Sequence, residues 1–152
     1  MSLSPNGRGP MSMPFDGDPV ACLRVPAKVG SLKLVRRMVR DAAESCGCSD
    51  ACARDIVIAV DEACQNVIRH AYAEGQEGDM VVDVRRDGDR LAINVVDFAP
   101  PVDTAAIRPR PLEELRPGGL GTHFIKECMD RIEFREPPPG AGNRLWMAKT
   151  IG

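Results

Sequence analysis

The sequence predicts an α+β fold, a two-layer sandwich in which a mainly antiparallel, mixed sheet is covered on one face by three helices. Three observations lead to this class. Apolar residues recur at helical spacing in three segments, and five further segments show the alternation or the short apolar runs of strands. Asp87-Gly88 lies between two alternating segments and is a strong signal for a tight antiparallel hairpin. Paired strands with helices segregated on one face give two layers around one core.

The first half of the regular structure begins with a strand and continues with two helices. Apolar residues 20–25 predict a strand that ends at Pro26. A helix of about four turns is expected between Ser31, a suitable N-cap, and Gly47, a suitable C′ residue. A longer amphipathic helix is expected over residues 50–73, because its apolar residues share one face.

The second half contains four strands and one shorter helix. Residues 80–85 and 91–96 alternate between the two faces of a strand pair. After a long proline-rich interval, residues 120–129 show the spacing of a third amphipathic helix. Residues 132–134 and 145–149 predict the last two strands, separated by a turn rich in proline and glycine.

Two segments are not expected to form regular structure. Residues 1–18 are rich in proline and glycine without a hydrophobic period, so we expect a flexible N-terminal tail. Residues 98–117 contain five prolines, and a loop of this length inside a compact domain is typical of a lid or binding loop. We therefore expect one domain over residues 19–152 with a lid at about 102–117.

Chain length and charge exclude several classes of protein. The 152 residues suit one domain, and 43% hydrophobic residues allow it to bury a core without disulfides or a metal. The formal net charge of −2 argues against a sequence-independent nucleic-acid binder, which needs a basic surplus. No apolar run approaches the ~20 residues of a membrane span, and the N-terminus lacks the apolar core of a signal peptide. We expect a cytoplasmic protein with no direct contact to nucleic acid or membrane.

A cluster of cysteines is the one candidate for metal or redox chemistry. Cys46, Cys48 and Cys52 lie where the first predicted helix ends and the second begins. Structural zinc sites usually combine two short ligand pairs, and no second pair is present. The alternative is three reduced thiols without a function of their own.

A polar stripe runs along the second predicted helix. Glu62, Asn66 and His70 are spaced four residues apart and lie beside the apolar face of that helix, at the edge of the core. A carboxylate and an amide oxygen are hard ligands that suit Mg²⁺. The alternative is a solvated helix face, with His70 hydrogen-bonded at the edge of the core.

Two further elements carry chemistry that a nucleotide would need. Asp97 ends an apolar strand, and its carboxylate can accept a hydrogen bond from an exocyclic amine such as that of adenine. It could equally be an aspartate that initiates a turn. Glycines at 118, 119 and 121 open the third helix, whose N-terminus suits a phosphate. The segment is neither a Walker A motif nor a Rossmann fingerprint, and an ordinary glycine-rich helix entry remains the alternative.

Four motifs, in this order, resemble the N box, the two glycine boxes and the closing element of the histidine-kinase-like (GHKL) ATPase superfamily. They are Glu62-x3-Asn66-x3-His70-Ala71-Tyr72, Val96-Asp97 with the following loop, Gly118-Gly119-Leu120-Gly121, and Gly142-Asn143-Arg144-Leu145. The short chain and Val25-Pro26-Ala27 make it most similar to the bacterial anti-sigma factor serine kinases. The resemblance covers residues 20–151 and implies the histidine-kinase-like ATPase fold.

The resemblance also implies a role for individual residues. Glu62 would be the general base for an attacking serine hydroxyl, and Asn66 would coordinate Mg²⁺ that bridges the phosphates of ATP. Asp97 would recognise the adenine amino group. The remaining nucleotide-binding positions would be His70, Ala99, Gly118, Gly119, Leu120, Gly121 and Thr122.

The function that the resemblance implies is a partner switch. The chain would phosphorylate a serine of a STAS-type anti-anti-sigma protein, and it would hold a sigma factor once that partner is phosphorylated. It could also form a homodimer. The lid cations Arg108, Arg110 and Arg116 could meet phosphates, although neighbouring glutamates make a solvated lid equally plausible.

One departure from the family pattern leaves alternatives open. Ala99 occupies the place of a glycine in the first glycine box, and Pro100 follows it. Because a residue before proline is restricted to extended conformations, we expect Ala99 to avoid the left-handed region. A binding module that has kept the fold and lost kinase activity is the main alternative function. A cysteine-based metal or redox sensor is the third.

Overall fold

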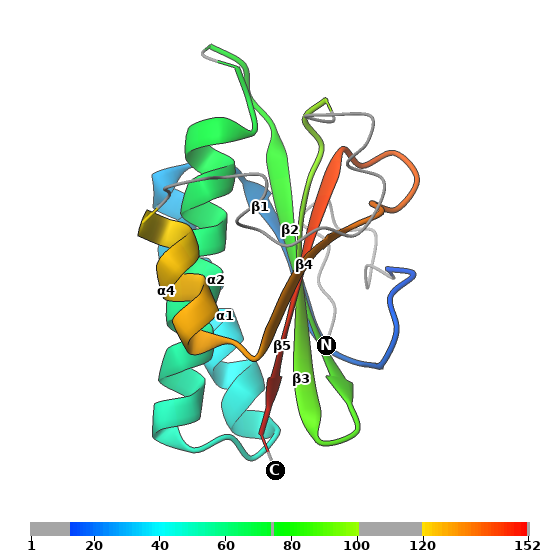
Figure 1. Cartoon of the computed structure of the whole chain (residues 1–152). Helices are drawn as coiled ribbons and strands as arrows, with labels where there is room; N and C mark the ends of the chain where they lie inside the picture. Colours follow the sequence, from blue (N-terminus) through cyan, green and yellow to red (C-terminus); the bar gives the residue numbers. More distant parts are fainter. Residues whose placement is uncertain (1–12, 74, 101–119, 152) are drawn as a thin grey trace.

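The computed structural model describes residues 13–73, 75–100 and 120–151 of the chain (Figure 1). Its helices and strands follow the predicted order. They are β1 (Asp18–Pro26), the 3-10 turn η1 (Val29–Ser31), α1 (Leu32–Ser45), α2 (Asp50–His70), β2 (Asp79–Asp87), β3 (Arg90–Asp97), α4 (Leu120–Cys128), β4 (Arg131–Arg135) and β5 (Asn143–Thr150).

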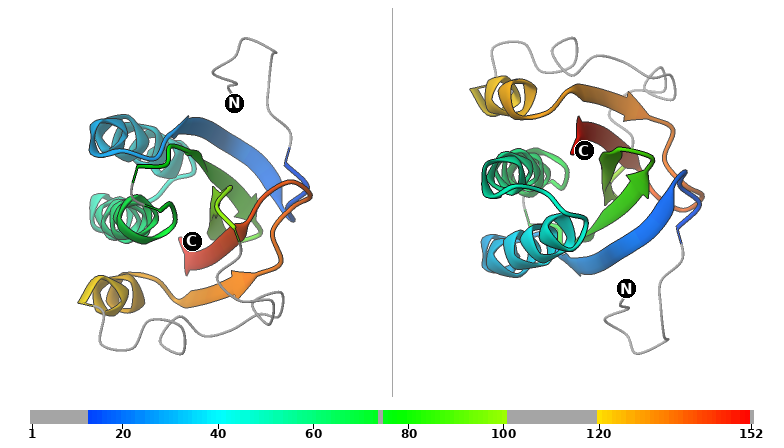
Figure 2. Two further views of the ribbon diagram at one scale, coloured as in Figure 1. Left: turned by 90° about the horizontal axis from the view of Figure 1, so that it is seen from above. Right: turned by 90° about the horizontal axis from the view of Figure 1, so that it is seen from below.

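The strands form one sheet in the order β1-β2-β3-β5-β4, and the three helices lie on one face of it (Figures 1 and 2). The predicted two-layer α+β sandwich is confirmed. All four neighbouring pairs are antiparallel, so the sheet is not mixed as expected. The chain leaves β3, forms α4 and the edge strand β4, and returns as β5 between β4 and β3.

The core lies between the sheet and the helices, and the alternation of the strands determines which side chains enter it. In β2 and β3 the helix-facing residues are fully buried and belong to one cluster with the apolar faces of α1 and α2. These residues include Met80, Val82, Leu91 and Ile93. Burial of such side chains is worth about 1.5–3 kcal/mol each, so this interface supplies the main driving force for folding.

The helices begin and end largely where local capping rules predict. The two exceptions are the start of α1 and the end of α2. Gly47 has φ +88° and ends α1 as expected. Ser49 caps α2, because its Oγ accepts the N–H of Cys52 at 3.1 Å. Ser31 precedes α1 but makes no side-chain cap hydrogen bond. The second helix ends at His70, three residues earlier than expected, where the chain turns towards β2.

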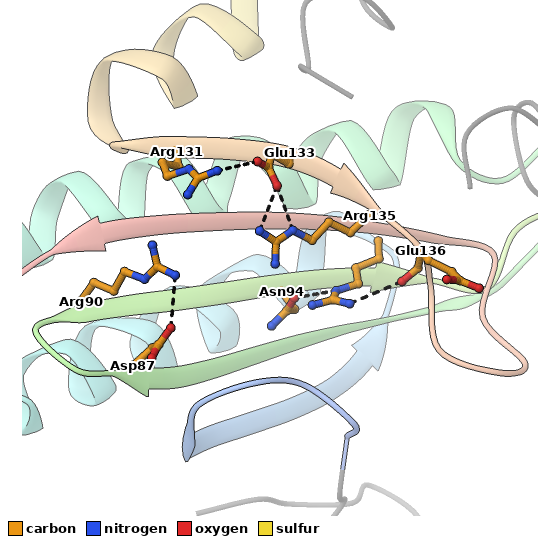
Figure 3. Close-up of polar contacts among 8 residues, drawn as sticks. Asp87, Arg90, Asn94, Arg131, Glu133, Arg135 and Glu136 are labelled. Carbon is orange, nitrogen blue, oxygen red and sulfur yellow. Dashed lines mark hydrogen bonds and ion pairs between the residues drawn. The ribbon is translucent and has the colours of Figure 1, made fainter. Parts of the chain in front are cut away.

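The face of the sheet opposite the helices carries a network of charged side chains (Figure 3). Arg131 and Arg135 on the edge strand both pair with Glu133 at 2.9 Å. The guanidinium of Arg135 lies 3.6 Å from the ring centroid of Trp146, which is 4% exposed. The aliphatic and planar parts of the arginines thus cover an aromatic ring that no helix of the described chain covers.

The boundary expected for the flexible N-terminal tail, residue 18, lies too late in the chain. Asp18 already begins β1, and residues 13–17 lie against the outer face of the sheet, where Phe15 is buried. The Arg85 guanidinium donates to the carbonyl oxygens of Met13 at 2.7 Å and Phe15 at 3.0 Å, and it pairs with Asp83 at 2.9 Å. Hydrogen bonds from the Arg85 side chain and the burial of Phe15 hold this segment, so the expectation of a flexible tail is wrong for residues 13–18.

Among the described residues, no helix is both long enough and apolar enough to span a membrane. The longest one, α2, has 21 residues but too many polar side chains to cross a bilayer.

Candidate functional site

Asp97 is a buried carboxylate held at the end of β3. Its side chain is among the few charged groups in the interior, at 6% exposure of the residue. Asn143 Nδ2 donates to Asp97 Oδ1 at 2.9 Å, and the N–H of Ala99 donates to the same oxygen at 3.1 Å. Asp97 pairs with Asn143 in the register of β3 and β5, which explains why the two side chains meet. The carboxylate therefore has a defined orientation before any ligand is present.

Gly142 is required by the close approach of two chain segments. A Cβ on Gly142 would lie 1.6 Å from the carbonyl oxygen of Ala99, so a larger residue could not occupy this position. The N–H of Gly142 donates to the carbonyl oxygen of Asp97 at 2.9 Å. The motif at the start of β5 therefore packs directly against the beginning of the loop after β3.

Ala99 avoids the left-handed region, as the following proline predicts. Among the described residues, only glycines have positive φ, so Ala99 lies outside the left-handed region. Its side chain is buried, with 2% of the residue exposed. The loop after Asp97 thus suits alanine, although the family pattern has glycine there.

Ala99→Gly is expected to leave nucleotide affinity unchanged and to lower the free energy of unfolding by about 0.4–1 kcal/mol. The glycine would relieve no strain, and it would increase the conformational entropy of the unfolded chain. Nucleotide titrations and urea unfolding curves of both proteins test this expectation. A tenfold gain in affinity would instead mean that the alanine constrains the site.

Tyr72 connects the ends of β2 and β3, a role that the sequence analysis missed. Its hydroxyl donates to the carbonyl oxygen of Asp79 at 2.5 Å and accepts the N–H of Phe98 at 2.9 Å. Burial raises the pKa of Tyr72, which keeps the hydroxyl protonated as this geometry requires. A Cβ on Gly78 would lie 2.1 Å from the Tyr72 ring, so a second glycine makes room for the tyrosine.

A hollow of about 670 Å³ lies beside Tyr72, at the same end of the sheet. Arg24 lines it, pairs with Asp79 at 2.9 Å and lies 4.3 Å from the ring centroid of Phe98. The residue after Asp97 therefore contributes its ring to this hollow. Neither Asn66 nor Asp97 is among the described residues that line it.

The polar stripe of α2 is present, with a gradient of exposure. Glu62 and Asn66 are partly exposed, and His70 at the end of the helix is exposed. Glu62 lines a second hollow, of about 270 Å³, together with Asp61 and Phe124. Arg36 of α1 lines it as well, so all three helices contribute residues to the hollow that contains Glu62.

Neighbouring carboxylates on α2 have different partners. Asp61 accepts from Arg36 Nη1 and from Gln65 Nε2, both at 2.7 Å. Glu62 Oε2 lies 4.0 Å from Arg69 Nη2, a longer and weaker contact. Arg69 Nη2 is also 2.8 Å from Gln65 Oε1. Asp61 thus makes two short contacts within the protein, whereas the described ion-pair contact of Glu62 is long.

Part of the predicted site lies outside the described residues. This applies to Gly118, Gly119 and the lid over 102–117 with Arg108, Arg110 and Arg116. Helix α4 begins at Leu120, as expected, and contains Gly121 and Thr122 in its first turn. A helix N-terminus therefore follows the glycine-rich segment, as a phosphate-binding role requires.

The cysteine cluster does not have the geometry of a metal site in the described residues. In the parts of the chain that the structure describes, no group of three or more histidine, cysteine, aspartate or glutamate side chains could hold a metal ion. All six cysteines are free thiols. The described geometry therefore gives no support to a metal site at Cys46, Cys48 and Cys52.

Fold and site together define a histidine-kinase-like ATPase domain, and comparison with known proteins agrees. The profile described as histidine kinase-like ATPase domain matches residues 25–149, so the chain belongs to this family. Its membership in the anti-sigma factor serine kinases follows from its relatives. Serine-protein kinase RsbW of Halalkalibacterium halodurans is 37% identical over 122 residues, which cover 75% of this chain and 74% of that protein.

A second relative and one solved structure extend the comparison. Serine-protein kinase RsbW of Oceanobacillus iheyensis is 28% identical over 137 residues, 85% of each chain. The crystal structure of the RsbU and RsbW domains of Rv1364c from Mycobacterium tuberculosis matches with a TM-score of 0.59 at 19% identity. That match covers 86% of this chain and 32% of the other, and it supports the fold alone.

Proposed function

We propose that this protein binds ATP with Mg²⁺ and phosphorylates a serine of an anti-anti-sigma partner. The observation that carries the proposal is the orientation of Asp97, whose carboxylate is buried at a strand end and held by Asn143 and Ala99. Such a carboxylate is a preformed acceptor for the amino group of adenine. Membership in a family of ATPases and kinases supports the same ligand.

The donor set on α2 fits the cofactor that the family implies. Asn66 would supply an amide oxygen for the metal, and Glu62 lies one turn before it on the same side of the helix; both side chains reach solvent at the edge of the core. Hard oxygen ligands of this kind, with water completing the shell, suit Mg²⁺. When bound, ATP and Mg²⁺ supply the phosphoryl group and neutralise the charge that moves with it.

The residues of this chain would then contribute mainly by positioning the reacting groups. Glu62 would accept the proton of the serine hydroxyl, Asn66 would hold the metal, and Asp97 would fix the adenine. The N-terminus of α4 would stabilise phosphate charge. A correctly placed general base contributes roughly 10²–10⁴-fold to a rate, so Glu62 accounts for part of the catalysis and positioning for the rest.

The wider role that follows is regulation of a sigma factor. The protein would hold a sigma factor when the anti-anti-sigma partner is phosphorylated, and it would release the factor when that partner is not. Self-association into a homodimer and a cytoplasmic location fit this role. The competing function is a partner-switch module that binds without transferring phosphate.

The two functions are separated by one experiment. Purified protein is incubated with γ-labelled ATP, Mg²⁺ and its anti-anti-sigma partner, and label on the partner is measured. A kinase transfers label to one serine, and replacement of that serine by alanine abolishes the signal. A module without activity binds the partner and leaves it unlabelled.

Nucleotide is expected to stabilise the fold. At ~100 times the dissociation constant, ATP or ADP with Mg²⁺ should add about 2.7 kcal/mol to the free energy of unfolding. Thermal unfolding with and without millimolar nucleotide measures this shift. Absence of any shift would contradict nucleotide binding and with it both catalytic roles.

Asp97→Asn is expected to weaken nucleotide binding about tenfold or more. The amide can still accept from Asn143, but its NH₂ group then faces the adenine amine, and a mismatched buried pair costs about 1–3 kcal/mol. Calorimetric titration with ADP measures the change. Asp87→Asn, on the exposed hairpin, is the matched control and should leave affinity unaltered. Equal affinity of both variants would refute the role of Asp97.

A further inference from the structure

Two thiols meet at the turn between α1 and α2, away from the proposed nucleotide site. Cys48 lies in the turn, and Cys52 lies in the first turn of α2. Their Sγ atoms are 3.7 Å apart. Both side chains are partly exposed, so a small reagent can reach them from solvent.

The backbone on both sides holds these thiols in place. The N–H of Cys48 donates to the carbonyl oxygen of Ala43 at 3.1 Å, which attaches the turn to α1. The N–H of Cys52 donates to Ser49 Oγ at 3.1 Å, which caps α2. The contact between the sulfurs is therefore a property of a capped helix and a closed turn, and it needs no rearrangement of the chain.

The other cysteines are poor candidates for the same chemistry. Cys22, Cys64 and Cys128 are buried in the interior. Their burial keeps a reagent in solvent from reaching their sulfur atoms, whereas Cys48 and Cys52 are partly exposed. Cys46 is partly exposed and lies close to the pair, but its Sγ is directed to Ser45 Oγ at 4.0 Å.

We propose that Cys48 and Cys52 are a dithiol that low-molecular-weight disulfides oxidise to an intrachain disulfide. One thiol loses its proton and attacks a sulfur of the oxidant, whose S–S bond breaks and whose second half leaves as a thiolate. The other cysteine then attacks the mixed disulfide and releases the first half. Two protein thiols are oxidised, one external disulfide is reduced to two thiols, and the protons pass to the leaving groups.

The geometry requires only a small closing movement. The sulfurs must approach from 3.7 Å to a bond of about 2.05 Å. Cys48 precedes α2 and Cys52 lies in its first turn, so the bond would join the interhelical turn to the start of α2. Glu62 and Asn66 lie further along α2, so the modification is expected to leave nucleotide binding intact.

Local charge predicts how the reaction depends on pH. Burial, together with the neighbouring thiols of Cys52 and Cys46, raises the pKa of Cys48 to about 12, and Arg86 counteracts part of this. Cys48 is therefore protonated at neutral pH, and oxidation should become faster as the pH rises. The pair is expected to respond slowly, as a dithiol without a strongly activated thiolate.

The test uses the full-length reduced protein and oxidised glutathione. After incubation, intact mass is measured first; the remaining thiols are then alkylated for peptide mapping. We expect a loss of mass equal to two hydrogen atoms, a bond between Cys48 and Cys52, and full recovery after dithiothreitol. C46S is the matched control and should behave like wild type, whereas C48S and C52S should instead accumulate a glutathione adduct.

Several outcomes would overturn the proposal. They are six alkylatable thiols after oxidation, a bond that includes Cys46, a bond between two chains, or loss of the intrachain bond in C46S. The result is independent of the proposed function, because it is read from mass alone. Nucleotide-induced stabilisation, measured on reduced and oxidised protein, should be the same in both forms.

Discussion

Glu62→Gln should lower the rate of serine phosphorylation about 10²–10⁴-fold while nucleotide affinity stays unchanged. The amide has nearly the shape of the carboxylate, but it cannot take the proton of the serine hydroxyl. Glu62 is partly exposed, and its described ion-pair contact, to Arg69, is 4.0 Å long, so little stability should be lost. The initial rate of label transfer to the partner and a nucleotide titration measure the two quantities.

The control for this experiment is the same substitution elsewhere on the helical layer. Glu44 is an exposed residue of α1, and its contact with Arg40 is also 4.0 Å long. Glu44→Gln should therefore transfer phosphate at the wild-type rate. Wild-type activity of Glu62→Gln would mean that another group, or water, removes the proton.

Arg85→Met should lower the free energy of unfolding by about 3–5 kcal/mol. The side chains of Arg85 and Asp83 are 6% and 2% exposed, so removing the guanidinium leaves a buried carboxylate without its ion-pair partner. The carbonyl oxygens of Met13 and Phe15 lose donors as well, and residues 13–17 should detach from the sheet. Urea unfolding measures the first effect, and proteolysis near residue 15 measures the second.

Two variants show whether burial of the pair causes this loss. Arg40→Met removes one partner of an exposed pair on α1 and should cost only about 0–1 kcal/mol. The double variant Asp83→Leu with Arg85→Met removes both buried charges and should recover a large part of the stability. A loss below about 1 kcal/mol for Arg85→Met would contradict an interior role for this pair.

The fold could be predicted because its signals are local. The period of the apolar residues distinguished α1, α2 and α4 from the strands, and Asp87-Gly88 predicted the hairpin between β2 and β3. Gly88 has φ +63°, the conformation that a tight hairpin turn requires. Pro100 similarly predicted that Ala99 avoids the left-handed region, because the restriction acts between adjacent residues.

Contacts between distant segments could not be predicted in the same way. Asp83 and Arg85 alternate with apolar residues in β2, and alternation of this kind usually marks a solvent-facing side. In the structure the N-terminal segment covers them, through carbonyl groups that carry no side-chain signal. The link between Tyr72 and Phe98, and the approach of Gly142 to Ala99, also depend on backbone atoms far apart in the sequence.

In the candidate site, too, local features could be predicted from the sequence, whereas contacts between distant segments could not. Residue type and spacing were enough to single out Glu62, Asn66 and Asp97, because a helix stripe and a strand end are local features. Only the tertiary structure decided what surrounds them: Asn143 reaches Asp97 through the β3–β5 register, and Phe124 of α4 lines the same hollow as Glu62. The physical reason is the distance along the sequence over which each interaction acts. Periodicity and capping act over one or two turns of chain, whereas the orientation of a buried polar group is set by whichever distant donor can satisfy it.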